Sequence, residues 1–475
     1  MMMEQSPFQI RGVIEGFYGA FYTFPERNDL IRFIGAHGYN LYVYGPKNDR
    51  QHRNRWREPY PAVVMEQFRA TAAIAAEAGV RFCYAISPLN YDSTKDLPNL
   101  MGKLKDMYDC GIHAFSVLVD DILCTVHHEP SCSICAWPAD LDIALCNGLY
   151  EWLTALDPSC SLSICPTQYH GRAPFGTYLH DLGVGLHPEI DIFYSGPHVC
   201  SAELTTADVG DFAAAIQRRP LIWDNYPVND LSMRPYMHIG PIRSREATLH
   251  EVVRGIVVNP MLQAEASKIP LRTWAEYFHD PYSYDPWGAW ERALLAIGGA
   301  VNYDALLRFA ENSLHSCLRL SELPKLERLV KAAIADIESD HQGACGASCR
   351  ELRSYLDVLD EACYELKNRM ENLRLRHDLL QWVEALDEWV WVGKRAMRLL
   401  DAMEHGKPHD HLARGLNNAM EEVQAHSKRT SGNALLPFGR AVLEHVGQLR
   451  SGQAAGREHT PTVVEHEGYP NGLAA

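Results

Sequence analysis

Two adjacent acidic residues are the sharpest chemical feature of the sequence. Asp120 and Asp121 end the apolar run HAFSVLVDD at positions 113–121. Two carboxylates this close do not both ionise freely, so the pKa of one of them tends to rise. A carboxylic acid that keeps its proton near neutral pH can act as a general acid. The structural alternative is that one Asp caps the next loop while the other pairs with a Lys or Arg.

Neighbouring acids favour one particular kind of hydrolysis. Most glycosidases place two carboxylates on separate strands, on either side of the bond that breaks. Adjacent acids do not easily lie on opposite faces of one bond. They fit better a scheme in which the substrate supplies its own nucleophile. One acid then protonates the leaving oxygen and the other orients a substrate amide, which is the substrate-assisted route of N-acetyl sugars.

Polar and aromatic side chains accompany the other apolar runs. Aromatic faces pack on the apolar faces of sugars, while amides, carboxylates and Lys bind sugar hydroxyls. Core packing is the alternative for several of the rings. The aromatic residues are Phe17, Tyr18, Tyr42, Tyr44, Tyr169, Trp223 and Tyr226. The polar residues at or just beyond the ends of the runs are Glu15, Lys47, Asp120, Asp121, Tyr169, Asp224, Asn225 and Asn259.

The elements that must position these side chains are strands alternating with helices. Eight short runs rich in β-branched and aromatic residues lie at 10–19, 40–46, 81–88, 113–121, 161–169, 191–197, 220–227 and 255–260. Amphipathic segments such as 26–38 and 245–255 separate them and are predicted helices. Eight apolar strands alternating with helices predict an α/β fold, a (β/α)8 barrel, whose active site lies at the strand carboxyl ends. An open doubly wound sheet is the alternative, but no GxGxxG follows the first strand.

The remainder of the chain reads as helices. From about residue 300 the apolar residues recur at three-four spacing, as in 352–366 and 379–400. We therefore expect a barrel over 1–300, an all-α helical bundle domain over 301–450, and a polar, disordered tail over 451–475.

Composition and charge exclude several classes of protein. The chain has 475 residues and a net charge of −16, so a dedicated nucleic-acid binder is not expected. No apolar run approaches the roughly 20 residues that cross a bilayer. Thirteen cysteines, with no basic-then-apolar leader, favour reduced thiols and a cytoplasmic location.

A second constellation follows the two acids directly. Cys124, His127, His128, Cys132 and Cys135 form a zinc-like grouping. The alternative is a surface loop of free thiols. We predict neither a metal nor a cofactor, because the substrate-assisted chemistry needs none. A metal-dependent barrel hydrolase is the rival, and it would lose its activity in EDTA.

Six motifs together resemble a known family. They are VIEGFYG (13–19), YGPKND (44–49) followed by WREPY (56–60), VLVDDI (117–122), CPTQY (165–169), WDNYPVND (223–230) and VVNP (257–260). In this order, along roughly residues 10–300, they resemble glycoside hydrolase family 84. That family contains protein O-GlcNAcases and bacterial β-N-acetylglucosaminidases. The resemblance implies a TIM-barrel catalytic domain and retaining hydrolysis through an oxazoline, formed by the 2-acetamido group of the substrate.

The resemblance also implies catalytic roles for individual residues. Asp121 would be the general acid/base, Asp120 would orient the acetamido N–H, and Tyr169 would assist oxazoline formation. The backbone of Gly16 and the side chain of Lys47 would meet the sugar.

Four further residues would complete the sugar site. Trp223 and Asn225 would wall and bond the acetamido pocket, Asp230 would bind the 4- and 6-hydroxyls, and Asn259 would also bond the sugar. Three departures from the family pattern are Gly45, Asn48 and Gln168. They touch none of these positions, although Gln168, beside Tyr169, puts rate and pH optimum in doubt.

The predicted function is hydrolysis of terminal β-linked N-acetylglucosamine. The substrate is O-GlcNAc on Ser or Thr of proteins, or a short GlcNAc-bearing glycan; the missing leader favours a cytoplasmic substrate over hyaluronan. One alternative is a catalytically silent GlcNAc- or glycoprotein-binding module, against which the retention of both acids speaks. Hyaluronidase-like activity is another. We expect no nucleic-acid or membrane partner, while a homo-oligomer stays open. The resemblance implies only loosely that the helical region contacts the substrate protein.

Overall fold

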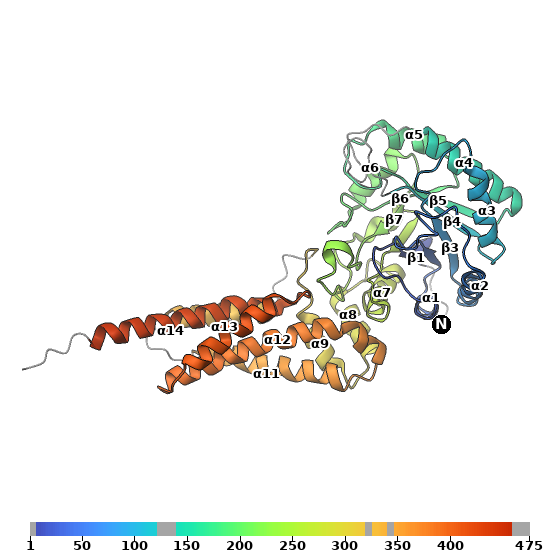
Figure 1. Cartoon of the computed structure of the whole chain (residues 1–475). Coiled ribbons are helices and arrows are strands. Elements are labelled where there is room, and N and C mark those ends of the chain that lie inside the picture. Colours follow the sequence, from blue (N-terminus) through green and yellow to red (C-terminus); the bar gives the residue numbers. More distant parts are fainter. Residues whose placement is uncertain (1–5, 121–138, 319–324, 340–345, 458–475) are drawn as a thin grey trace, which may run out of the picture. The chain divides into compact units, whose positions relative to one another are not determined.

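The computed structural model describes residues 6–120, 139–318, 325–339 and 346–457, with no side-chain description beyond residue 448 (Figure 1). Asp121 and the Cys124–Cys135 grouping lie outside these ranges. The chain divides into two compact units. One comprises Met1–Pro324, Glu361–Asp387 and Ser427–Ser431, and the other comprises Lys325–Asp360, Glu388–His426 and Gly432–Ala475.

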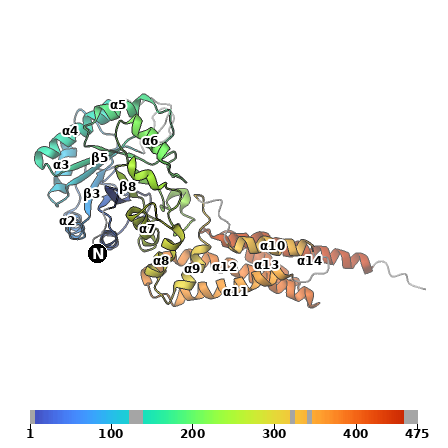
Figure 2. The same cartoon turned by 180° about the vertical axis from the view of Figure 1, so that it is seen from behind.

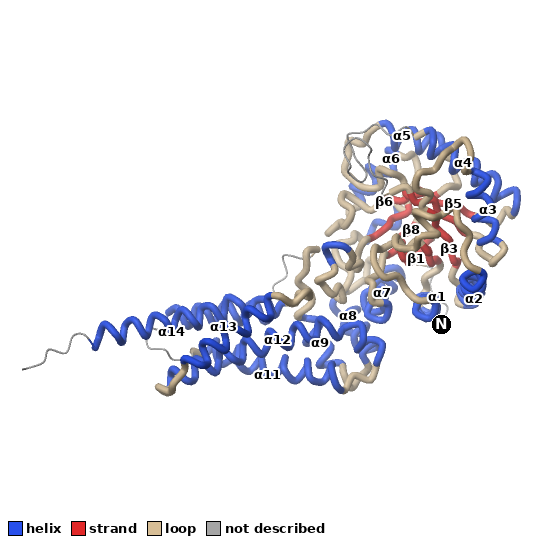
Figure 3. Tube along the Cα trace, viewed as in Figure 1, coloured by secondary structure: helices blue, strands red, loops and turns tan. Residues whose placement is uncertain are grey.

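The first unit is built on a closed barrel of eight parallel strands, in sequence order. Figure 3 shows the strands at its centre and helices around them. The strands are β1 (Ile10–Glu15), β2 (Leu41–Tyr44), β3 (Arg81–Ile86), β4 (Ala114–Leu118), β5 (Ser161–Cys165), β6 (Asp191–Tyr194), β7 (Leu221–Asp224) and β8 (Gly255–Val258). β8 pairs with β1, which closes the sheet. The predicted (β/α)8 barrel with a helical region after it is confirmed.

Both faces of the strands are buried, which explains their near-continuous apolar runs. One alternating set, including Ile14, Val43 and Val257, forms a small cluster in the barrel interior. The other set, including Val13 and Tyr42, joins the larger cluster beneath the helices. Successive side chains of a strand point to opposite faces, so each strand contributes to both clusters.

Helices cover the outside of the barrel. They are α1 (Phe24–Ala36), α2 (Ala62–Glu77), α3 (Leu97–Tyr108), α4 (Asp140–Leu156), α5 (Thr177–Gly185), α6 (Thr206–Ala215), α7 (Ala264–His279) and α8 (Pro286–Gly298). α1 begins with a capping box, in which Thr23 accepts from the Glu26 N–H and Glu26 accepts from the Thr23 N–H.

The prediction of a helix over 245–255 is wrong. This connection contains only the 3₁₀ turns η1 (Leu231–Met233) and η2 (Ala247–Glu251). The Glu246 N–H donates to Leu204 O at 3.2 Å, and the Arg254 N–H donates to Pro220 O at 2.8 Å. Because tertiary hydrogen bonds fix both ends of the segment, too few residues remain between them for an α-helix.

The regular elements that the structure describes after β8 are helices. The remaining helices are α9 (Tyr303–Glu311), α10 (Lys325–Ser339), α11 (Ala347–Asn368), α12 (Leu373–Glu404), α13 (Asp410–Gln424), the 3₁₀ turn η3 (Ser431–Ala434) and α14 (Leu435–Arg457). α10 packs along α14 in the second unit (Figure 2). α14 continues through Arg457, into the range predicted to be a disordered tail. Among the described helices, none combines the length and apolarity that crossing a membrane requires.

Candidate active site

A cavity of about 350 Å³ opens at the carboxyl ends of the barrel strands. Every predicted site residue within the described ranges lines it: Gly16, Lys47, Asp120, Tyr169, Trp223, Asn225, Asp230 and Asn259. The barrel topology thus brings together residues from loops after six different strands. Asp121 follows Asp120 directly in the chain and lies outside the described residues, so its position remains a prediction.

Lys47 and Asp120 form a buried ion pair in the cavity wall. The Lys47 ammonium donates to Oδ2 of Asp120, and the two residues are 6% and 4% exposed. Lys47 Nζ also lies 5.5 Å from the centroid of the Trp223 ring. One Asp is therefore paired with a Lys, as the structural alternative expected. Because the pair also lines the cavity, the Asp120 carboxylate can accept a hydrogen bond from a bound molecule.

Amide groups from two strand ends lock each other's orientation. Oδ1 of Asn225 accepts from Trp223 Nε1–H at 3.0 Å and from Asn259 Nδ2–H at 2.8 Å. Asn225 Nδ2–H donates to Val199 O at 2.7 Å. The Gly16 N–H reaches Oδ1 of Asn259 at 3.3 Å. Since the Asn225 oxygen already has two donors, Asn225 can offer a sugar its second N–H but not its oxygen.

Gly16 is required by the close approach of an indole ring. A Cβ at this position would lie 2.3 Å from Cζ2 of Trp223. Real Cβ contacts are essentially never that short, so any larger residue would displace the ring. Trp223 consequently lies directly against the backbone that follows β1, and the two form one wall of the cavity.

Asp230, in the loop after β7, is a second acidic residue of the cavity lining. Its Oδ2 accepts the Tyr18 N–H at 2.8 Å. The next amide, Gly19 N–H, donates to Oδ1 of Asn48 at 3.0 Å. Tyr18 OH in turn accepts from Arg53 Nη1–H at 3.0 Å. These bonds join the loops after β1, β2 and β7 around one edge of the cavity, and so fix the Asp230 carboxylate.

The family model described as beta-N-acetylglucosaminidase matches residues 11–311, well over half of the chain. The chain belongs to this family. This match confirms the predicted resemblance to glycoside hydrolase family 84. It also confirms, at the level of the family, the predicted enzyme class of glycoside hydrolase.

Curated relatives of this β-N-acetylglucosaminidase family member include two mammalian proteins. The protein O-GlcNAcases of Rattus norvegicus and Mus musculus are each 31% identical over 278 residues. The match spans 56% of this chain and 30% of theirs. The chain therefore covers less than a third of the length of these relatives.

Solved structures extend the likeness beyond the barrel. A mutant of the Thermobaculum terrenum O-GlcNAc hydrolase is 29% identical, with a TM-score of 0.83, and the match covers 95% of this chain and 98% of that one. CpGH84B is 24% identical with a TM-score of 0.77, over 92% of this chain and 78% of that one, and supports the fold alone.

Two of the polar residues predicted at the barrel mouth, Glu15 and Asp224, do not line the cavity. Glu15 is fully buried and lines no part of the cavity. Arg27 Nε–H donates to its Oε2 at 2.7 Å, and Tyr42 OH donates to the same oxygen at 2.6 Å. The Tyr22 N–H satisfies Oε1 at 3.0 Å. Glu15 therefore ties β1 to α1 and β2, because a buried carboxylate requires such partners.

Arg245 is a positioning residue that the sequence did not indicate. Its guanidinium makes a bidentate pair with Asp224 at the end of β7, with Nε–Oδ2 and Nη2–Oδ1 distances of 2.8 Å. It also donates to Ala202 O at 2.8 Å and Ser201 O at 3.0 Å. Arg245 thereby fastens the loop that carries Val199 to the strand that carries Trp223. The available signal was Asp224 itself, an acid inside an apolar run that needs a cationic partner.

The rest of the cavity lining is uncharged. Its remaining lining residues are Tyr18, Cys165, Val199, Cys200, Val228, Leu231, Ser232, Met233, Cys317 and Leu318. Leu231 is 58% exposed and holds a φ of 45°. Within the described lining, no three His, Cys, Asp or Glu side chains lie close enough to share a metal ion.

Proposed function

We propose that the chain is a retaining β-N-acetylglucosaminidase that uses substrate-assisted catalysis. The observation that carries the proposal is the buried Lys47–Asp120 pair, in one cavity with Tyr169 and Asn225. It supplies an ionised carboxylate whose charge is balanced, next in sequence to Asp121. A neutral N-acetyl sugar suits such a site, because it brings no net charge into it.

The chemistry assigns a different role to each acid. Asp121 donates its proton to the glycosidic oxygen while the acetamido oxygen attacks C1 and the bond to the aglycone breaks. Asp120 accepts the acetamido N–H and stabilises the positive charge of the oxazolinium that forms. Asp121 then removes a proton from water, which opens the oxazoline at C1. Two displacements at C1 leave the GlcNAc product with the β configuration of the substrate.

We propose O-GlcNAc on proteins as the substrate. The uncharged remainder of the lining, in which Val199 and Leu231 are exposed, suits a neutral aglycone such as a peptide carrying Ser or Thr. Hyaluronan carries a carboxylate on every second sugar and would need a cationic partner. In the described lining Lys47 is the only cation, and it already pairs with Asp120. The rodent relatives are named protein O-GlcNAcases, which agrees with this choice.

A cytoplasmic location belongs to the same proposal. The described cysteines include the free thiols Cys83, Cys110, Cys146, Cys160, Cys200 and Cys317. Free thiols persist in a reducing compartment. Protein O-GlcNAc on intracellular chains would then be within reach of the enzyme.

Hydrolysis of aryl β-GlcNAc by wild type and Asp121→Asn tests the proposal. The wild type should cleave aryl β-GlcNAc and leave an aryl β-glucoside intact, because the glucoside lacks the acetamido nucleophile. Asp121→Asn should lose on the order of 10²–10⁴-fold in turnover with a poor leaving group, the range of general acid catalysis, and far less with an activated aryl group.

Two outcomes would contradict the assignment. Equal losses with both leaving groups would remove Asp121 from the acid role. Equal cleavage of the glucoside would remove the acetamido group from the mechanism. For the substrate, cleavage of a hyaluronan oligosaccharide but not of an O-GlcNAc peptide would reverse the choice made above.

A further inference from the structure

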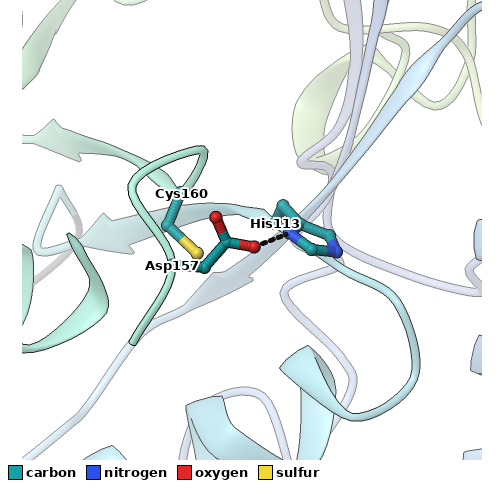
Figure 4. A group of neighbouring side chains, drawn as sticks. All are labelled: His113, Asp157 and Cys160. Carbon is teal, nitrogen blue, oxygen red and sulfur yellow. Dashed lines mark hydrogen bonds and ion pairs between the residues drawn. The ribbon is translucent and has the colours of Figure 1, made fainter. Parts of the chain in front are cut away.

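Three side chains of metal-binding types converge in one place (Figure 4). They lie before β4 and β5, whereas the cavity lies after these strands. His113 directly precedes β4, and Asp157 and Cys160 lie in the turn between α4 and β5. The cavity residues Asp120 and Tyr169 follow the same two strands. A five-residue strand is about 16 Å long, so this cluster is separate from the candidate active site.

The three ligand atoms lie close enough together to share one ion. One ring nitrogen of His113, one carboxylate oxygen of Asp157 and Sγ of Cys160 all lie within 4.8 Å of one another. Nδ1 of His113 and Oδ2 of Asp157 are 3.0 Å apart. Ligand atoms around a tetrahedral zinc ion are about 3.3–3.8 Å apart, so side-chain shifts of about 1 Å would complete the set.

Neighbouring groups hold the Asp157 carboxylate in place and offer a fourth ligand atom, an oxygen. The Ser159 N–H donates to Oδ1 of Asp157 at 2.8 Å. Oδ2 faces the imidazole and also accepts from Tyr108 OH at 3.4 Å. Ser159 Oγ lies 3.3 Å from His113 Nδ1. Hydrogen bonds of this kind orient the ligands in metal sites.

The cluster is accessible to an ion from one side. The side chains of His113 and Asp157 are 45% and 24% exposed, while Cys160 lies buried beneath them.

We propose that His113, Asp157 and Cys160 bind a divalent cation of the zinc class. A mixed nitrogen, oxygen and sulfur set suits Zn²⁺, whereas Mg²⁺ and Ca²⁺ take oxygen ligands. Cys160 binds as the thiolate and releases its proton to solvent, and Ser159 Oγ or water fills the fourth position. The ion joins the turns that begin β4 and β5, so it stabilises the folded barrel.

Cobalt binding to the full-length chain tests this site. The parent protein for the test carries Cys132→Ser and Cys135→Ser, so that the other Cys and His grouping does not supply the signal. After removal of metal with a chelator, one Co²⁺ per chain should bind, with a near-ultraviolet thiolate-to-cobalt band that Zn²⁺ abolishes. Cys160→Ser should remove the band and weaken binding at least 10-fold. His113→Ala, at a half-exposed position, should weaken binding by a similar factor.

The control is Cys110→Ser, which changes a buried thiol in the turn before His113 and should alter neither the band nor the affinity. Circular dichroism reports whether each variant folds. Absence of the band in the parent protein, or unchanged binding in both Cys160→Ser and His113→Ala, would overturn the proposal. Hydrolysis of aryl β-GlcNAc should be the same in His113→Ala as in the parent, so the metal site and the proposed function fail independently.

Discussion

At the scale of residues, the charge balance of the cavity depends on Lys47 and Asp120. Both are almost fully buried. Either charge alone would destabilise the folded state, because burial removes its hydration and no partner would replace it. Together they keep an ionised carboxylate beside the position where the acetamido N–H would lie. Their pairing therefore links the stability of the barrel end to the proposed chemistry.

Replacing the cation should damage both properties. Lys47→Met leaves Asp120 buried without its ammonium partner, which should lower the free energy of unfolding by about 3–5 kcal/mol. Turnover of aryl β-GlcNAc should fall along with it, because the carboxylate no longer stays ionised in place. Urea unfolding and steady-state kinetics measure the two effects. Lys47→Arg, which keeps the charge, should recover part of both; a Lys47→Met enzyme with wild-type stability and turnover would show that the pair has neither role.

A buried histidine in the same loop should make the barrel sensitive to acid. His52 Nδ1–H donates to Ala85 O at 2.7 Å, and the Ser87 N–H donates to His52 O at 3.0 Å, so His52 joins the loop after β2 to the end of β3. Burial lowers the pKa of His52 to about 4. Between about pH 6.5 and 4 the unfolded chain binds a proton that the folded chain does not, so stability falls as the pH falls through this window.

The loss should reach about 3 kcal/mol in the unfolding free energy at the acid end of the window. Urea unfolding at pH 7.5 and 4.5, followed by tryptophan fluorescence, gives the pH dependence. His52→Gln keeps a side-chain donor and should flatten it. The matched control, His180→Gln at an exposed position, should keep the wild-type slope. The same slope in His52→Gln as in wild type would contradict the assignment.

At the scale of elements, the Asp224–Arg245 pair fixes the wall that carries Trp223 and Asn225. Arg245→Met should lower the free energy of unfolding by about 3–5 kcal/mol and raise KM more than it lowers kcat, because the wall shifts while the acids stay. Arg292→Met, which breaks an exposed pair with Glu276, is the control and should cost about 1 kcal/mol or less. Equal small effects from both substitutions would show that the buried pair does not position the site.

The strands were predictable because each is buried on both faces and carries an unbroken apolar run. The last connecting helix was not, because hydrogen bonds from Glu246 and Arg254 to distant loops override its helical periodicity. Glu15 was misplaced for a related reason. A polar residue at a strand end looks the same in sequence whether it faces the cavity or, as here, a buried Arg from the next helix. The role of Arg245 could not be predicted, because it lies in a loop and loop residues follow no periodic pattern.

At the scale of the whole molecule, the site follows from topology more than from local sequence. Residues as distant as Gly16 and Asn259 meet because a closed parallel barrel gathers all strand ends on one face. Helical periodicity, by contrast, predicts α11 and α12 but does not indicate that each contributes to both compact units. Most of the net charge of −16 lies outside the cavity, whose described lining holds two acids and one Lys.

The central claim, that the substrate's own acetamido group is the nucleophile, is tested most directly by fluorination. Replacing the hydrogens of the acetamido methyl one by one weakens the carbonyl oxygen as a nucleophile without changing the leaving group. We predict that kcat/KM for aryl β-GlcNAc falls steeply with each fluorine. A flat series would mean that a protein carboxylate attacks C1, and would contradict the mechanism proposed for Asp120 and Asp121.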